Sequence, residues 1–135
     1  MTRPAEYLTV ADIIEAHAQI MESMGLTPQP LRSLDLLESA AMKPQAAAYY
    51  AKADIAEQAA LLATGISQNQ PFLDGNKRTA YAAMRVFLTI NHVRIDAPVL
   101  EIARQLEAVA EREGSLEAAT LQFAAWLRER TVPRE

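Results

Sequence analysis

The chain has 135 residues, of which half are apolar and 6% aromatic, and its formal net charge is -4. This length suffices for one domain across residues 1–135, and the acidic balance argues against a nucleic-acid-binding protein, which is usually basic. Cysteine is absent, which excludes disulfides and thiolate metal sites, and no apolar run approaches the ~18 residues of a membrane span, so we expect a soluble, cytoplasmic protein.

The first predicted helix begins after Thr9. Thr9 and Asp12 have the spacing of a capping box, in which each side chain accepts a hydrogen bond from the other residue's backbone N–H. Apolar residues then recur at helical spacing, and Gly25 is suited to end the helix. His17 lies within this apolar face, which favours a buried side chain that is hydrogen-bonded to a neighbour.

A loop, a short helix and an irregular segment are predicted next. Pro28 and Pro30 interrupt the helical pattern, and Ser33 is suited to cap a helix that reaches about Ala40. Residues 42–53 are the least regular part of the chain, because a proline within them disfavours helix at the residue before it. An ordinary connecting loop with two packed tyrosines is one interpretation of this segment.

Residues that can begin or end a helix divide the rest of the chain. The residues expected to begin the remaining helices outside residues 70–91 are Asp54, Asp96 with Pro98, and Ser115. Helices are therefore expected at residues 55–69, from 96 to 113, and from 115 onward. Asn91 and His92 form a turn in which Asn91 is suited to a left-handed conformation, and His92 is expected to be exposed and not catalytic. We expect an all-α protein of about six or seven helices.

Residues 70–79, with the sequence QPFLDGNKRT, are the most informative part of the chain. Pro71 fixes one φ angle, Asp74 can cap a helix, and Gly75 permits a backbone conformation that other residues resist. A helix is predicted from Asn76 to about Asn91. A glycine-containing loop that leads into a helix presents unpaired N–H groups and the positive end of the helix dipole, which together favour an anion.

The first turn of this helix carries two cations. Asn76, Lys77 and Arg78 add side-chain donors there, although positive charge at a helix N-terminus is normally disfavoured. A phosphate bound at this turn would explain why the sequence tolerates that arrangement.

Residues 70–78 resemble the signature of the Fic/Doc family, His-x-Phe-x-Asp-(Gly/Ala)-Asn-(Gly/Lys)-Arg. Lys77 is similar to the Doc (death-on-curing) branch, since the adenylylating Fic branch has glycine there. A second run, Leu-Leu-Glu-Ser-Ala at residues 36–40, is similar to another Doc-like motif. One position departs from the signature, because Gln70 stands where the family has its catalytic histidine.

The resemblance covers about residues 7–128 and implies a compact all-α Fic/Doc-like bundle. It also implies a flap within residues 42–53, in the form of a short hairpin that lies over the cleft and pairs with a segment of the target by strand addition. The flap residues would include Lys43, Pro44, Tyr49 and Tyr50. For His17, the resemblance adds a second interpretation, in which this side chain helps to shape the cleft.

The chemistry that the resemblance implies is transfer of part of ATP to a hydroxyl of a target protein. Adenylyl transfer is the commoner reaction of the family, whereas Doc-type toxins transfer the terminal phosphate, with elongation factor Tu as the implied target. Asp74 would hold Mg²⁺, which is typically bound by one or two carboxylates together with phosphates. Phe72 would anchor the loop in the core. The residues expected to bind the phosphates are Gly75, Asn76, Lys77 and Arg78.

Gln70 decides between the functional interpretations. A carboxamide cannot accept a proton near neutral pH as histidine does, and loss of a general base typically costs ~10²–10⁴-fold in rate. Phosphoryl transfer depends mainly on positioning and electrostatics, so a glutamine that orients the hydroxyl could leave weak activity. The first interpretation is an impaired Doc-like toxin held in check by a small antitoxin. The second is an inactive pseudoenzyme that binds a nucleotide or a partner, and the third is a helical interaction domain whose loop is only structural.

Overall fold

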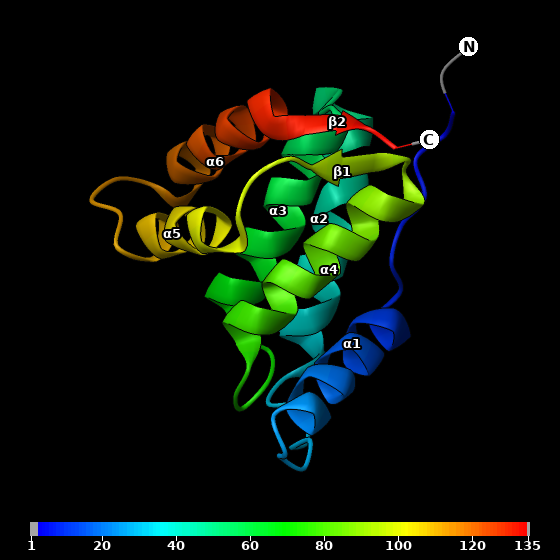
Figure 1. Ribbon diagram of the computed structural model, residues 1–135, viewed down its shortest axis with the longest axis vertical. Helices are drawn as coiled ribbons and strands as arrows, with labels where there is room; N and C mark the ends of the chain where they lie inside the picture. Colours follow the sequence, from blue (N-terminus) through cyan, green and yellow to red (C-terminus); the bar gives the residue numbers. More distant parts are fainter. Residues whose placement is uncertain (1–2, 135) are drawn as a thin grey trace.

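The computed structural model describes residues 3–134 of the chain (Figure 1). The elements follow in the order α1 (Val10–Ser23), α2 (Leu34–Ala51), α3 (Ile55–Asn69), α4 (Asn76–Ile90), β1 (Val93–Ile95), α5 (Val99–Ala110), α6 (Leu116–Arg130) and β2 (Thr131–Pro133). The two short strands pair in antiparallel fashion, with Val93 opposite Pro133. The prediction of an all-α protein is confirmed, since six helices make up most of the described residues.

Helix α3 lies at the centre of the arrangement (Figure 1). It contacts α2, α4, α5 and α6, whereas α1 packs on α4 near the end of the molecule where the chain passes from α3 to α4. Ten of the fifteen residues of α3 are buried. Small side chains allow neighbouring helices to approach it on several sides. The small buried residues of α3 are Ala56, Ala59, Ala60, Ala63, Gly65 and Ser67.

The helix ends predicted from local patterns are largely confirmed. Thr9 and Asp12 form the capping box of α1, with both hydrogen bonds present. Gly25 has a φ of +74° directly after this helix, and the N–H of Leu26 donates to the carbonyl of Met21, as in a Schellman motif. The side chains that cap the N-termini of the later helices are those of Ser33, Asp54 and Ser115.

The prediction of a flap at residues 42–53 is wrong, because one helix of 18 residues, α2, continues through residues 42–51. Neither a hairpin nor a loop forms at Lys43, Pro44, Tyr49 and Tyr50. Pro44 removes one intrahelical hydrogen bond, but the alanine-rich stretch that follows has high helix propensity. Packing also holds the helix together, because Pro44 is buried and a Cβ atom placed on Gly65 of α3 would lie 3.2 Å from the Cα atom of Ala40.

Tyr49 and Tyr50 are not packed in the core either. Their side chains are 79% and 84% exposed, and their rings meet edge to face with centroids 4.8 Å apart. The helix that carries them ends at Ala51, and the residue after it, Lys52, adopts a left-handed conformation with φ +53°.

Two further boundaries differ from expectation. Helix α5 begins at Val99, with Pro98 as its N-cap, and ends at Ala110 rather than at Glu113. The left-handed residue after α4 is His92, with φ +63°, and not Asn91. The Asn91 side chain instead binds the N-terminal segment, because its carboxamide exchanges two hydrogen bonds of 2.9 Å with the backbone N–H and C=O of Glu6. His92 is exposed, as expected.

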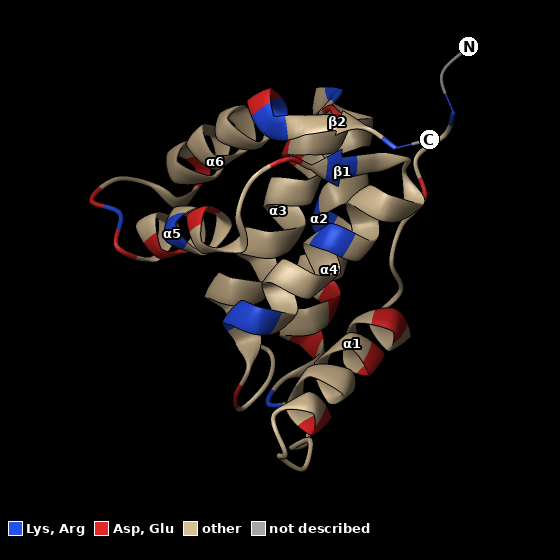
Figure 2. Ribbon diagram, in the orientation of Figure 1, with Lys and Arg blue, Asp and Glu red and all other residues tan. Residues whose placement is uncertain are grey.

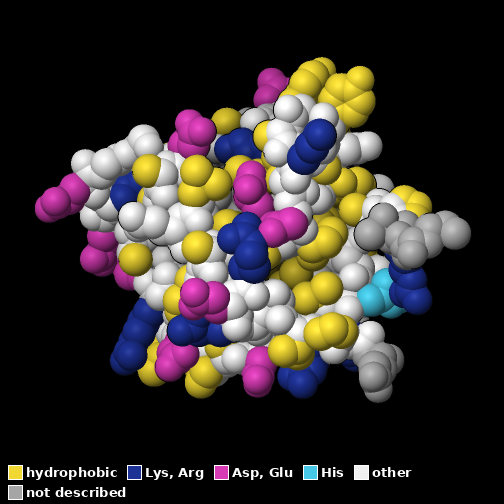
Figure 3. Space-filling model, turned by 90° about the horizontal axis from the view of Figure 1, so that it is seen from above, with side chains coloured by type: hydrophobic (Ala, Val, Ile, Leu, Met, Phe, Trp, Pro, Cys, Tyr) yellow, Lys and Arg dark blue, Asp and Glu magenta, His cyan; other side chains and the backbone are white. Residues whose placement is uncertain are grey.

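The surface of the described residues carries mixed charges. At the end of the molecule opposite the α3–α4 connection, acidic and basic side chains are interspersed with apolar ones (Figure 3). None of the helices in residues 3–134 combines the length and the apolar character needed to cross a bilayer.

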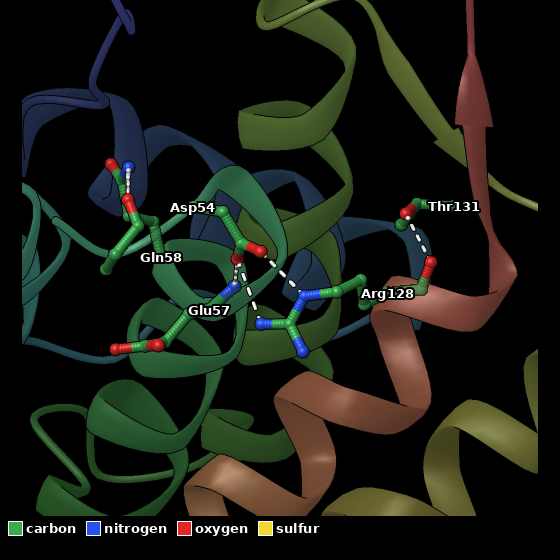
Figure 4. A network of polar contacts seen from close by, with 6 residues as sticks. Asp54, Glu57, Gln58, Arg128 and Thr131 are labelled. Atoms are coloured by element: carbon green, nitrogen blue, oxygen red, sulfur yellow. Dashed lines mark hydrogen bonds and ion pairs between the residues drawn. The ribbon is translucent and has the colours of Figure 1, made fainter.

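One polar network joins the start of α3 to the end of α6 (Figure 4). The Asp54 carboxylate caps α3 by accepting from the N–H of Glu57 at 2.9 Å, and it accepts from the guanidinium of Arg128 at 2.6 and 3.1 Å. The hydrogen bond from Arg128 is the main reason that the pKa of Asp54 lies below its usual value. The Asp54 carboxylate therefore caps α3 and also binds α6, which is distant in the sequence.

We expect Asp54→Ala to lower the free energy of unfolding by about 1 kcal/mol at pH 7, mainly because the helix cap is lost. The pKa of Asp54 is lower in the folded than in the unfolded state, so its stabilising effect is complete above the unfolded value, near 3.9, and disappears as pH falls through the folded value. Urea denaturation at a series of pH values from 7 downward measures both effects. Asp96→Ala is the control, since Asp96 pairs with Arg94 only at 4.0 Å and should change stability by less than ~0.5 kcal/mol. An equal loss for both variants, or a loss independent of pH, would contradict this account.

Candidate functional site

The connection between α3 and α4, residues 70–75, is called the signature loop below, and it is seated on the core by Phe72. The Phe72 side chain is 2% exposed, and its ring stacks on that of His17, with centroids 3.9 Å apart and planes 5° from parallel. Its backbone forms an isolated antiparallel bridge with Leu31, in the segment between α1 and α2. Phe72 therefore holds the middle of the loop against two earlier segments of the chain.

Asn76 closes the signature loop. Its carboxamide Oδ1 accepts from the N–H of Phe72 at 3.0 Å, and its Nδ2 donates to the carbonyl of Phe72 at 2.9 Å. Both ends of the carboxamide are thus engaged inside the protein, and the donors that Asn76 can still offer to a ligand are its backbone N–H and the second N–H of Nδ2.

Gly75 is the N-cap of α4 and has a φ of +78°, in the left-handed region that the sequence predicted for it. The expectation that Asp74 caps this helix is wrong, because its Oδ1 accepts from the adjacent N–H of Gly75 at 2.7 Å and no described side chain caps α4. An N-terminal turn leaves its first N–H groups without intrahelical partners. The start of α4 therefore combines free N–H groups with a nearby carboxylate.

Gln70 directly follows α3 as its C-cap and has a left-handed conformation, with φ +49°. Its N–H donates to the carbonyl of Ile66 at 3.1 Å, and its carbonyl accepts from Nε of Arg32 at 2.7 Å. The same guanidinium donates to the carbonyl of Asn69, also at 2.7 Å, so a cation lies at the C-terminus of α3, where the helix dipole favours it. The backbone of Gln70 is fixed by these contacts, and its side chain is exposed.

A cavity of about 500 Å³ brings together most of the residues that the sequence singled out. Of the predicted site residues, it is lined by Gln70, Asp74, Gly75, Asn76, Lys77 and Arg78. The other lining residues, which the sequence did not single out, are Met21, Met24, Ser67 and Leu73. Phe72 does not line the cavity, and neither do the residues of the expected flap.

The two cations of the first turn of α4 differ in their surroundings. The Lys77 ammonium pairs with the Glu107 carboxylate of α5, and both side chains are about half exposed, at 53% and 49%. The hydrogen bond from Lys77 is the main cause that lowers the pKa of Glu107. Arg78 forms no ion pair within residues 3–134. The two helices at this end of the molecule also differ in the sign of their charge. All the Asp, Glu, Lys and Arg residues of α1 are acidic, and all those of α4 are basic (Figure 2).

The donor set suits a hard cation that is shared with phosphates. Within the described residues no group of three His, Asp or Glu side chains could hold a metal by itself. Asp74 provides one carboxylate beside an uncapped helix N-terminus, which fits the way in which Mg²⁺ is held by one or two carboxylates, waters and substrate phosphates.

Two comparisons with known proteins agree with this geometry. The model of the Fic/DOC family matches residues 7–88. A protein named Toxin Doc from Mycolicibacterium smegmatis is 34% identical over 100 residues, which cover 71% of this chain and 77% of that protein. The chain belongs to the Fic/DOC family.

All the residues that line the 500 Å³ cavity fall inside the range that matches the Fic/DOC family, residues 7–88. Arg32 also lies in this range, but its partners are 37 and 38 residues away, so no local spacing could have revealed its role. Glu107 lies outside the range and is 30 residues from Lys77. Only the three-dimensional structure connects Arg32 and Glu107 with the site.

We expect Asn76→Ala to lower the free energy of unfolding by about 2 kcal/mol, because two hydrogen bonds are lost and the polar groups of Phe72 are left without partners. Asn76→Asp keeps an acceptor for the N–H of Phe72 but offers no donor to its carbonyl, so its effect is expected to be intermediate. Chemical denaturation measures both, with the exposed Gln45→Ala as a control that should change little. Equal stability of all three variants and the wild type would show that the loop does not depend on this carboxamide.

Proposed function

We propose that this Fic/DOC protein is a Doc-like toxin of a toxin–antitoxin pair, which uses ATP and Mg²⁺ to transfer a phosphate to a hydroxyl of a translation factor. The observation that carries the proposal is the uncapped N-terminus of α4, which meets Asp74, Lys77 and Arg78 at one cavity. The similarity to a protein named Toxin Doc supports the same reading. The target we propose is elongation factor Tu, and the partner is a small antitoxin in the same cytoplasm.

The roles of the residues follow from their contacts. The free N–H groups of the first turn and the Arg78 guanidinium would bind phosphate oxygens, the latter with its planar fork of donors. Asp74 would hold Mg²⁺, which neutralises phosphate charge when bound. Lys77 would join them after leaving Glu107. Asn76 would contribute its backbone N–H, because its carboxamide is already engaged with the backbone of Phe72 and mainly holds the loop.

Gln70 limits the rate in this proposal. Gln70 lines the cavity, and its carboxamide can donate and accept hydrogen bonds, so it would orient the target hydroxyl but could not take up the proton. Neither histidine of the chain replaces it. The Nε2 atom of His17 is buried and bonded to the carbonyl of Asp74, while His92 lies in the turn before β1.

A second candidate function is a pseudoenzyme that binds a nucleotide or a partner without transferring anything. The observation that favours it is again Gln70, which leaves the cavity with phosphate-binding groups but without a general base. Adenylyl transfer is the less favoured form of the first candidate, because Lys77 occupies the position at which the adenylylating branch has glycine.

Labelled ATP separates these functions. The protein as it stands, Gln70→His and Asp74→Asn are each incubated with Mg²⁺, elongation factor Tu and ATP that carries the label on either the γ- or the α-phosphate. We expect Gln70→His to label the factor from γ-labelled ATP about 10²–10⁴-fold faster than the unsubstituted protein, and Asp74→Asn to remove transfer. Label from the α-phosphate would establish adenylyl transfer. Binding of ATP without any labelling would favour the pseudoenzyme, and absence of ATP binding would contradict the proposed site.

The ion pair between Lys77 and Glu107 predicts a substitution that strengthens ATP binding rather than weakening it. A bound phosphate must compete with Glu107 for the Lys77 ammonium, so Glu107→Gln should tighten ATP binding by roughly two- to fivefold, the range of an exposed ion pair. Calorimetric titration at low and high salt checks this, because the gain should shrink as salt screens the exposed charges. Glu101→Gln, an exposed change in the first turn of α5, is the matched control. Weaker binding by Glu107→Gln would mean that Glu107 orients Lys77 toward the phosphates.

A further inference from the structure

We propose that His17 is a positioning residue for Asp74, which acts through the backbone of the signature loop and does not itself touch the substrate. The inference rests on the proposed nucleotide site and names the residue that sets its metal-binding carboxylate. It begins from a polar side chain that lies in the apolar face of α1, between the buried residues Ile13 and Met21.

The contacts of His17 are made to two residues of the loop. Its side chain is 2% exposed, its ring stacks on Phe72, and its Nε2 atom lies 2.9 Å from the carbonyl oxygen of Asp74. A carbonyl oxygen can only accept a hydrogen bond, so Nε2 carries the proton and donates. The imidazole therefore supplies both a flat apolar surface and a directed donor.

The hydrogen bond fixes the peptide that joins Asp74 to Gly75, and the stack on Phe72 fixes the imidazole that donates it. A Cβ atom placed on Gly75 would lie 3.5 Å from both Cδ2 and Nε2 of the imidazole, so the ring also packs along the left-handed residue that begins α4. With the carbonyl of Asp74 held inward, the carboxylate stays at the cavity and one of its oxygens accepts from the N–H of Gly75. Loss of the donor would let this peptide turn and would move the carboxylate relative to the first turn of α4.

Packing alone does not require a histidine at this position. A phenylalanine would fill similar space and keep the stack on Phe72, but it would leave the Asp74 carbonyl without its partner. The two roles can thus be separated by a pair of variants. His17→Phe keeps the ring and removes the donor, and His17→Gln keeps a donor and removes the ring.

The test is calorimetric binding of ATP with Mg²⁺ and with EDTA, which gives the factor by which Mg²⁺ improves the affinity of each variant. We expect Asp74→Asn to lose this factor. His17→Phe should reduce it at least fivefold and change metal-free binding by less than twofold, while His17→Gln restores at least half of it. Because His17 acts through Asp74, His17→Phe should have no further effect on the factor in the Asp74→Asn background.

The outcomes separate the inference from the proposed function. If Mg²⁺ improves ATP binding by the wild type and Asp74→Asn loses the improvement, but His17→Phe retains it or weakens metal-free binding equally, His17 is only a packing residue and the inference fails alone. If the effects of the two substitutions multiply in the double variant, His17 does not act through Asp74. If the wild type shows no Mg²⁺-dependent affinity for ATP, the proposed function and the inference fail together.

A measurement on the unsubstituted protein keeps the inference testable if His17→Phe does not fold. Nitrogen NMR of the imidazole should show Nε2 protonated, and its signal should shift when Mg²⁺ with ATP is added but not when ATP is added with EDTA. An Nε2 signal without a proton, or one unaffected by Mg²⁺ with ATP, would overturn the proposed connection.

Discussion

The two hydrogen bonds between the Asn76 carboxamide and the backbone of Phe72 are the constraint on which the rest of the site depends. They close the chain over five residues, so the loop must reverse direction just before α4 and Gly75 takes up the left-handed turn. Because Phe72 is buried, the start of α4 is held against the core, while no described side chain caps its first N–H groups. A helix whose N-terminus is fixed but uncapped is suited to bind an anion without rearrangement.

The parts of the fold that could be predicted are those determined within a few residues. The capping box of Thr9 and Asp12 and the left-handed Gly25 depend on spacing and on backbone sterics, which are visible in the sequence. The path of α2 depends instead on a contact with Gly65, which lies more than twenty residues further along the chain. The local preference of Pro44 was therefore overridden by packing that no neighbouring residue reveals.

The candidate site divides in the same way. Residues 74–78 lie together because they are contiguous, and their residue types alone indicated a phosphate site. The groups that support them come from elsewhere: Arg32 holds the end of α3, and Glu107 binds the Lys77 ammonium from α5. Even within the loop, the role of Asp74 was predicted incorrectly as a helix cap, because Gly75 occupies the cap position. Long-range pairs of this kind follow only from the folded arrangement.

The backbone of Gln70 is held by contacts that do not involve its side chain. A non-glycine residue in the left-handed region typically costs about 1–2 kcal/mol, and here Arg32 offsets this cost by binding the carbonyls of Asn69 and Gln70. These contacts involve only the backbone of Gln70, so they place its Cα atom at the cavity whatever side chain it carries. The shape and the charges of the rest of the cavity are therefore independent of the side chain at this position. In the proposed function, the chain can therefore keep the residues that bind the nucleotide although glutamine stands at the position of the general base.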